Sequence, residues 1–144
     1  MKHIGLRSMI TNKEKNEWQY LLFYDVDRPI NQVDKDWITE NLRDIASLIY
    51  STKQGFHFVG LTPLDCFEWA VYFEKLKDRF HEYYSGHTIR LSLKKKEEQK
   101  LIMYNDKMPV AYPLARIYEE RFNISFKYKI PMLAIFEQYQ TRKS

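Results

Sequence analysis

The chain has 144 residues, of which 44% are hydrophobic and 16% aromatic, so it can form one domain with its own core. The formal net charge of +4 is compatible with a polyanionic partner but does not establish one. A single cysteine excludes an internal disulfide framework and a cysteine-based zinc site, and no apolar run reaches the roughly 20 residues of a membrane span. We therefore expect a cytoplasmic protein that does not enter a membrane.

Extended and helical patterns alternate over the first two thirds of the chain. Runs of aromatic and aliphatic residues, bounded by turn-forming residues, predict strands. These strands cover residues 3–10 (a short edge strand), 18–27, 48–52, 56–61 and 88–93. Apolar residues at helical spacing predict two helices, over residues 34–48 with Asp34 as the N-cap and over residues 63–81 with Pro63 in the first turn.

From residue 18 onward these elements follow the order β-α-β-β-α-β. That order predicts an α+β fold of the RRM-like or ferredoxin-like type, with both helices on one face of the sheet. The second helix should bury six apolar residues against the sheet, namely Phe67, Ala70, Val71, Phe73, Leu76 and Phe80. We expect a single domain over residues 1–144, with the RRM-like core over residues 18–94.

Residues 95–144 are expected to form a C-terminal β-α-β-α extension. Its predicted elements are a strand over 101–104, a helix over 112–122, a strand over 123–130 and a short final helix over 131–139.

Two carboxylates at the end of the strand over residues 18–27 form the first candidate site. Side chains alternate between the faces of a strand, so Asp25 and Asp27 should project from the same face. Paired carboxylates favour a hard cation such as Mg²⁺ or Mn²⁺. His57, on an adjoining strand, would complete a compact group on that face.

The strand that ends in Asp25-Val-Asp27, the helix after it and the segment Ser51-Thr-Lys-Gln-Gly-Phe-His57 resemble the archaeo-eukaryotic primase superfamily, the primase-polymerases. The first motif of that family is hydrophobic-Asp-hydrophobic-Asp. Its second motif is a small residue, any residue and then His, often preceded by a turn rich in Ser and Gly. The resemblance covers roughly residues 18–94, and both motifs are short.

This resemblance implies an RRM-like sheet whose exposed face binds a divalent metal through Asp25 and Asp27 and a nucleotide through His57. The implied catalytic residues are Asp25, Asp27 and His57. The candidate nucleotide-binding residues are Ser51, Lys53, His57 and Arg90. The resemblance further implies a role in DNA replication, with nucleic acid and nucleoside triphosphate as partners, in an archaeal virus or plasmid and hence in the host cytoplasm.

Two features depart from the family. Its members carry a third carboxylate on the strand after the second helix, whereas residues 85–93 contain none, and His87 would be a poor magnesium ligand in its place. The residues before Trp18 are also too few for the αβ unit that precedes the core of the family's polymerases. Because two-metal phosphoryl transfer needs several carboxylates, we expect weak metal binding and very slow or absent synthesis.

A non-catalytic RRM-like binding module is the alternative. The segment over residues 54–61 is similar to the third-strand signature of RNA-recognition motifs, which stacks bases on exposed aromatic side chains. Strand alternation puts Phe56 and Phe58 on the face opposite to His57. We expect His57 to face outward with Asp25 and Asp27, close enough to share one ligand directly or through water, and both phenylalanines to be buried. The reverse arrangement would favour the RNA-binding module.

Overall fold

The computed structural model describes residues 2–12, 15–80, 83–84, 88–90 and 99–140. Its helices are α1 (Gln32–Asn41), α2 (Cys66–Arg79) and α3 (Leu114–Phe122). Its strands are β1 (Lys2–Asn12), β2 (Glu17–Tyr20), β3 (Phe23–Val26), β4 (Ser47–Ser51), β5 (Phe56–Gly60), β6 (Tyr83–Tyr84), β7 (Thr88–Arg90), β8 (Leu101–Asn105), β9 (Val110–Tyr112) and β10 (Lys129–Gln140).

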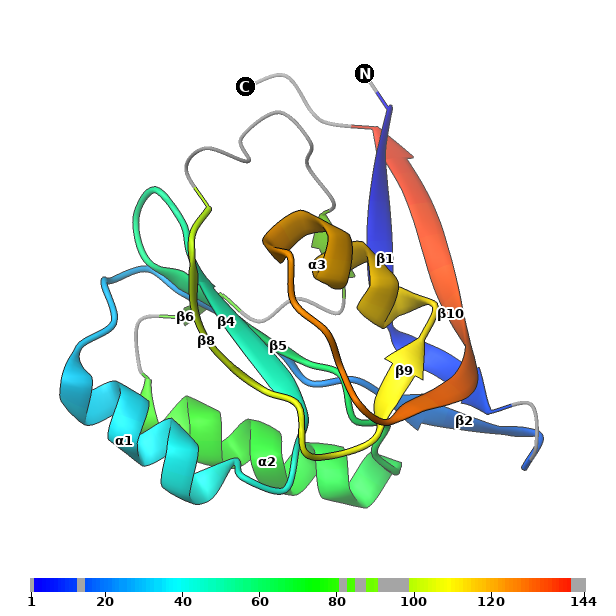
Figure 1. Ribbon diagram of the computed structural model, residues 1–144, viewed down its shortest axis with the longest axis horizontal. Coiled ribbons are helices and arrows are strands. Elements are labelled where there is room, and N and C mark those ends of the chain that lie inside the picture. The colour runs from blue at the N-terminus through cyan, green and yellow to red at the C-terminus, as the bar shows by residue number, and fades with distance from the viewer. Residues whose placement is uncertain (1, 13–14, 81–82, 85–87, 91–98, 141–144) are drawn as a thin grey trace.

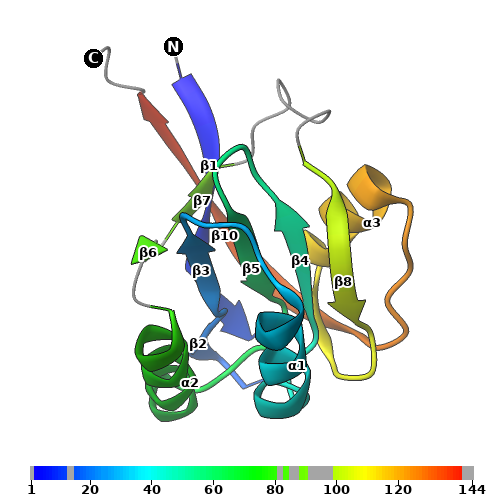
Figure 2. The ribbon, with the colours of Figure 1, turned by 90° about the vertical axis from the view of Figure 1, so that its left-hand side faces the viewer.

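An antiparallel sheet with the strand order β6-β3-β5-β4-β8, called here the core sheet, forms the centre of the molecule. In chain order, β3-α1-β4-β5-α2-β6 is a β-α-β-β-α-β unit. Helices α1 and α2 lie together on one side of the core sheet (Figures 1 and 2). The chain thus has an α+β architecture that is consistent with a ferredoxin-like fold.

A second sheet lies on the other side of the core sheet. Its strand order is β2-β1-β10-β9, with β7 also paired to β1. Helix α3 lies between this second sheet and the core sheet (Figure 1). The face of the core sheet that looks away from α1 and α2 is therefore partly covered.

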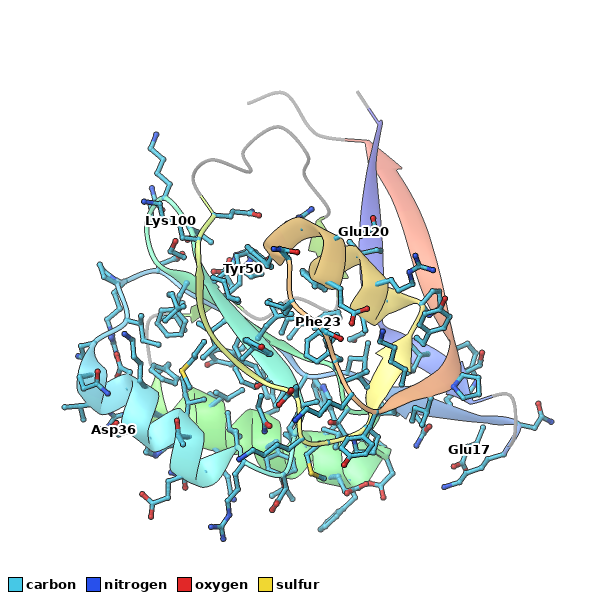
Figure 3. All side chains as sticks on the ribbon, viewed as in Figure 1. Glu17, Phe23, Asp36, Tyr50, Lys100 and Glu120 are labelled. Carbon is cyan, nitrogen blue, oxygen red and sulfur yellow. The ribbon has the colours of Figure 1, made fainter. Side chains whose placement is uncertain are left out.

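Two apolar clusters fill the spaces on the two sides of the core sheet, as strand alternation requires. On the side of α1 and α2 the buried residues are Leu22, Tyr24, Val26, Ile38, Leu42, Ile45, Ile49, Phe56, Phe58, Leu64, Leu76 and Phe80. On the side of α3 they are Ile10, Leu21, Phe23, Ala46, Leu48, Tyr50, Val59, Leu61, Val110, Ala111, Leu114, Ala115, Tyr118 and Phe126. Figure 3 shows Phe23 and Tyr50 between the core sheet and α3.

The single strand predicted over residues 18–27 is wrong, because it is divided between the two sheets. Leu21 donates its N–H to the Ser8 carbonyl at 2.7 Å, whereas the Leu22 carbonyl accepts from the Gly60 N–H at 2.7 Å. Both leucines are fully buried, each in a different apolar cluster. The chain therefore crosses from the second sheet to the core sheet at this pair.

The prediction that residues 88–93 form the last strand of the β-α-β-β-α-β unit is also wrong for the part that the structure describes. Thr88–Arg90 form β7, which pairs with Gly5–Arg7 of β1 in the second sheet. The core sheet is continued instead by Tyr83–Tyr84, which pair with Asp25 and Val26. The short strand over residues 3–10 is in fact β1, which is long and is hydrogen-bonded on both sides.

Helices α1 and α2 are both shorter than predicted, and a capping box fixes the start of each. Helix α1 begins slightly before the predicted start and ends well before the predicted end, whereas α2 begins later than predicted. In α1 the N-cap is Asn31, and the predicted cap Asp34 is the third helical residue, whose carboxylate accepts from the Asn31 N–H. In α2 the N-cap is Asp65, paired in the same way with Glu68. Helix α1 ends at Asn41 because residues 47–51 pair with β5.

Helix α2 does not bury the whole apolar face that its sequence predicts. Phe67 and Val71 are exposed, at 78% and 41%, as is Ala70. The indole N–H of Trp69 donates to the Leu21 carbonyl at 3.1 Å. Trp69, which was not predicted to face inward, therefore packs against the cluster together with the predicted Phe73.

The C-terminal extension is confirmed in its strand over residues 101–104, which is β8, and in its helix, which is α3. The strand over 123–130 and the final helix over 131–139 are wrong. Residues 129–140 form the long strand β10, antiparallel to β1. The Met, Leu, Ala, Glu and Gln of this segment favour a helix, but pairing with β1 outweighs that weak local preference. Among the described helices, none is both long and apolar enough to cross a bilayer.

The turn between β4 and β5 leaves no room for a side chain at Gly55. A Cβ atom added at this residue would lie 1.8 Å from the Val26 carbonyl oxygen. Because the atoms it would meet belong to the backbone, the strand itself would have to move to make room. We predict that Gly55→Ala lowers the free energy of unfolding by about 2–3 kcal/mol, as overpacking does. Urea denaturation measures this, with the exposed neighbour substitution Gln54→Ala as a control within about 0.5 kcal/mol of wild type. Equal stability of the two variants would contradict the prediction.

Candidate functional site

Three polar side chains form a row across three neighbouring strands of the core sheet. Asp25 of β3 lies opposite His57 of β5, and His57 lies opposite Tyr50 of β4. Residues that face one another across antiparallel strands project to the same face, so all three point toward the side of α3. Of the three residues predicted to share this face, Asp25 and His57 do so, whereas Asp27 lies beyond the end of β3.

Hydrogen bonds join the row from end to end. His57 Nε2 lies 3.1 Å from Asp25 Oδ1, and His57 Nδ1 lies 2.8 Å from the Tyr50 hydroxyl. The side chains of His57 and Asp25 are partly exposed, at 25% and 36%, whereas Tyr50 is 1% exposed. The row therefore runs from solvent into the core.

Aromatic neighbours hold Tyr50 in place. Its ring packs against Tyr118 and Phe122 of α3, with centroid distances of 6.2 and 5.5 Å. Burial, and next the proximity of Tyr118, raise the pKa of Tyr50 well above its usual value, while Arg121 opposes this rise. Burial raises the pKa of Tyr118 to about 12. Although the two hydroxyls influence each other, the Tyr118 hydroxyl has no partner in hydrogen-bond geometry among the described residues.

A surface cleft of about 290 Å³ opens beside the outer end of this row. Its lining residues come from the end of β3, from the β4–β5 turn, from β5 and from the start of the β8 segment. They are Asp25, Asp27, Thr52, Lys53, Gln54, His57 and Gln99. Helix α3 borders this region, because Arg121 donates to the Gln99 side-chain oxygen at 3.2 Å.

Asp27 lies in a bend beyond β3 rather than within the strand, and it is exposed. It reaches the cleft because the chain is anchored directly after it. Arg28 makes a two-point contact with the buried Asp34, at 2.6 and 3.1 Å, and Arg79 adds a third contact at 3.2 Å. Asp34 thus fixes the segment that carries both aspartates.

The other predicted nucleotide-binding residues are only partly brought to the cleft. Lys53 lines it and is exposed. Ser51 faces the opposite side, opposite Phe56, and its hydroxyl accepts from the Lys100 N–H at 3.1 Å. Arg90 lies in β7, whose strand partner is in the second sheet; its side chain, like His87, lies outside the described part of the chain.

The carboxylates do not form a metal centre on their own. Within the described ranges, no three His, Cys, Asp or Glu side chains come close enough to hold an ion together. One oxygen of Asp25 already accepts from His57. Two carboxylates on one cleft still suit Mg²⁺ or Mn²⁺ where phosphate oxygens and water provide the remaining ligands, which is the usual arrangement for magnesium with nucleotides.

The burial of Phe56 and Phe58 distinguishes the primase-like interpretation from that of an RNA-recognition module. Phe56 and Phe58 are each 1% exposed, in the cluster beneath α1 and α2. This confirms the expected strand phase. The aromatic platform that an RNA-recognition motif would present on this strand is therefore inside the protein.

Sequence analysis missed Tyr50, together with Thr52, Gln54 and Gln99. A signal for Tyr50 was present in the hairpin: with Ser51 paired to Phe56, the next pair must be Tyr50 with His57. No comparable signal marks Gln99, which reaches the cleft from a distant part of the chain.

Comparison of the chain with protein-family models, curated proteins and solved structures gave no match. The primase-polymerase assignment therefore stays a prediction from the sequence motifs, and any function must be argued from the site.

The Asp34 contacts lead to a prediction about acid stability. Its pKa lies below the usual value of 3.8, first because of the hydrogen bond from Arg28. A carboxylate with a lowered pKa stabilises the fold above its unfolded pKa, and this contribution disappears as the pH falls through the folded pKa. We predict that Asp34→Asn destabilises the protein by about 2–3 kcal/mol at pH 7.

This difference should shrink as the pH falls below about 4. Urea denaturation at several pH values tests it, with the exposed Asp36→Asn on the same helix as control. A constant difference between wild type and Asp34→Asn at all pH values would be inconsistent with this role.

Proposed function

We propose that the cleft binds the phosphates of a nucleotide or of a nucleic-acid end together with a divalent cation, as a reduced primase-polymerase-like domain. The observation that carries this proposal is the meeting of four groups at one cleft: Asp25, Asp27, Lys53 and His57. They come from the two sequence segments that resemble the primase motifs. Carboxylates for a cation and an ammonium group for a phosphate are the complementary charges of a metal–nucleotide complex.

The charge balance of the cleft favours joint binding of cation and nucleotide. Two carboxylates face one ammonium group, so a polyphosphate alone meets net repulsion. A Mg²⁺ or Mn²⁺ ion held by Asp25 and Asp27 would neutralise charge on the phosphates. Lys53 would then contact the phosphate oxygens from the turn.

Efficient nucleotidyl transfer is not part of the proposal. Two-metal transfer stabilises the attacking and leaving oxygens together, and it needs more carboxylate ligands than the two at this cleft. The described residues bring no third acid to it. We therefore infer that nucleotide binding persists while template-directed synthesis is very slow or absent.

The RRM-like interpretation of the core belongs to the same proposal. The strand order β6-β3-β5-β4 and the helices on one face support it. A binding module that stacks RNA on Phe56 and Phe58 is less favoured, because both rings are buried.

Calorimetry with a deoxynucleoside triphosphate and Mn²⁺ tests the proposal. We predict saturable binding by the wild type. Asp25→Asn and Asp27→Asn should each weaken it about tenfold or more, because each replaces a negatively charged ligand of the cation with a neutral one. Lys53→Gln should weaken binding less, by about threefold to tenfold, because it removes one exposed phosphate contact.

Lys107→Gln, an exposed lysine outside the cleft, is the matched control and should bind as the wild type does. Primer-extension assays with Mn²⁺ should show little or no product. Absence of nucleotide binding by the wild type would refute the proposed function. Robust synthesis lost in Asp25→Ala/Asp27→Ala would refute only the inference that catalysis is lacking.

A further inference from the structure

Tyr50 has no role in the motifs that suggest nucleotide binding, yet the structure connects its hydroxyl to the cleft. The hydroxyl lies 2.8 Å from His57 Nδ1, and the other ring nitrogen lies 3.1 Å from Asp25 Oδ1. Both nitrogens of His57 are therefore engaged within the protein. This leaves His57 no free nitrogen with which to contact a phosphate.

The chemistry of the three groups determines the direction of the hydrogen bonds. An ionised carboxylate only accepts, so His57 Nε2 must carry the hydrogen that Asp25 accepts. Tyr50 can donate its hydroxyl hydrogen to Nδ1, which completes a chain of donors that ends at the carboxylate. In this arrangement Asp25 and the Tyr50 hydroxyl favour the same tautomer of His57, and the two hydrogen bonds together fix the orientation of its ring.

We propose that Tyr50 is a positioning residue that acts through His57 to hold the Asp25 carboxylate, leaving its second oxygen for the ligand in the cleft. The consequence for Asp25 rests on the proposed function, whereas the effect on His57 does not. This role of Tyr50 and His57 resembles the common arrangement in which a hydrogen-bond partner outside the binding site orients a histidine or carboxylate ligand. It also assigns His57 a supporting role behind Asp25 in place of direct contact with phosphate.

The surroundings of Tyr50 make it suited to this role. Its ring is enclosed by Tyr118, Phe122 and the edge of His57 itself, whose ring centroid lies 5.1 Å away. A buried hydroxyl held by rigid rings loses little freedom when it bonds to His57. Removal of that hydroxyl alone would leave the packing intact and leave Nδ1 without its partner.

The direct test is the tautomer of His57, measured by ¹⁵N nuclear magnetic resonance of the imidazole nitrogens at neutral pH without metal or nucleotide. The His57 signals are assigned as those missing from His57→Gln. We expect the wild type to carry hydrogen on Nε2 and not on Nδ1. We expect Tyr50→Phe to keep that tautomer, because Asp25 is still present, while its Nδ1 resonance shifts to that of a ring nitrogen that accepts no hydrogen bond. The matched control Tyr24→Phe removes a buried hydroxyl on the other face of the core sheet, where it donates to the Phe80 carbonyl, and it should leave the Nδ1 resonance of His57 unchanged.

Hydrogen on Nδ1 in the wild type, or an unchanged Nδ1 resonance in Tyr50→Phe, would overturn the proposal. This measurement needs no ligand, so it decides the role of Tyr50 even if the wild type binds no nucleotide.

Where nucleotide binding is observed, a double-mutant cycle tests the path through His57. We expect Tyr50→Phe to weaken binding of the Mn²⁺–nucleotide complex about tenfold. Tyr50→Phe/His57→Gln should bind no more weakly than His57→Gln alone, because the hydroxyl acts only through the imidazole. Additive losses would show that Tyr50 acts independently of His57 and would overturn the proposed path.

Discussion

The register between β3, β5 and β4 is the constraint on which the candidate site depends. A shift of one residue in either pairing would move His57 to the face of α1 and α2 and bring a phenylalanine to the cleft. Two features hold this register. The apolar residues on each face can be buried in only one phase, and the backbone of Gly55 lies against the Val26 carbonyl, where a larger residue would not fit. The position of every polar side chain at the cleft follows from that register.

The site also depends on elements outside the β-α-β-β-α-β unit. Helix α3 encloses Tyr50 through Tyr118 and Phe122, and it bonds Gln99 through Arg121. The buried Asp34 anchors Arg28, which directly follows the second aspartate. The cleft is therefore a product of the core sheet together with parts of the chain on both sides of it. This explains how two short exposed segments can keep a defined arrangement.

The arrangement around His57 changes how the resemblance to primase-polymerases should be interpreted. In that family the histidine is expected to contact phosphates, but here both ring nitrogens bond to Tyr50 and Asp25. A ligand in the cleft would meet the exposed carboxylates and Lys53 first. Under the proposed function, the ligand and the aspartates together would hold the cation. Such an arrangement would suit recognition of a nucleotide more than transfer of one.

The sequence by itself determined the α+β class, the β4–β5 hairpin, the two helices beside the core sheet and the strand phase of His57. These features depend on periodicity and turn residues, which are patterns among residues close together in the sequence. Tertiary structure decided what local pattern cannot specify. It divided residues 18–27 between two sheets, paired Thr88–Arg90 with β1, and made residues 129–140 a strand because β1 offered unpaired backbone groups. It also brought Gln99 to the cleft and Tyr50 to His57, since contacts between distant segments depend on how the sheets pack and on which strands become neighbours.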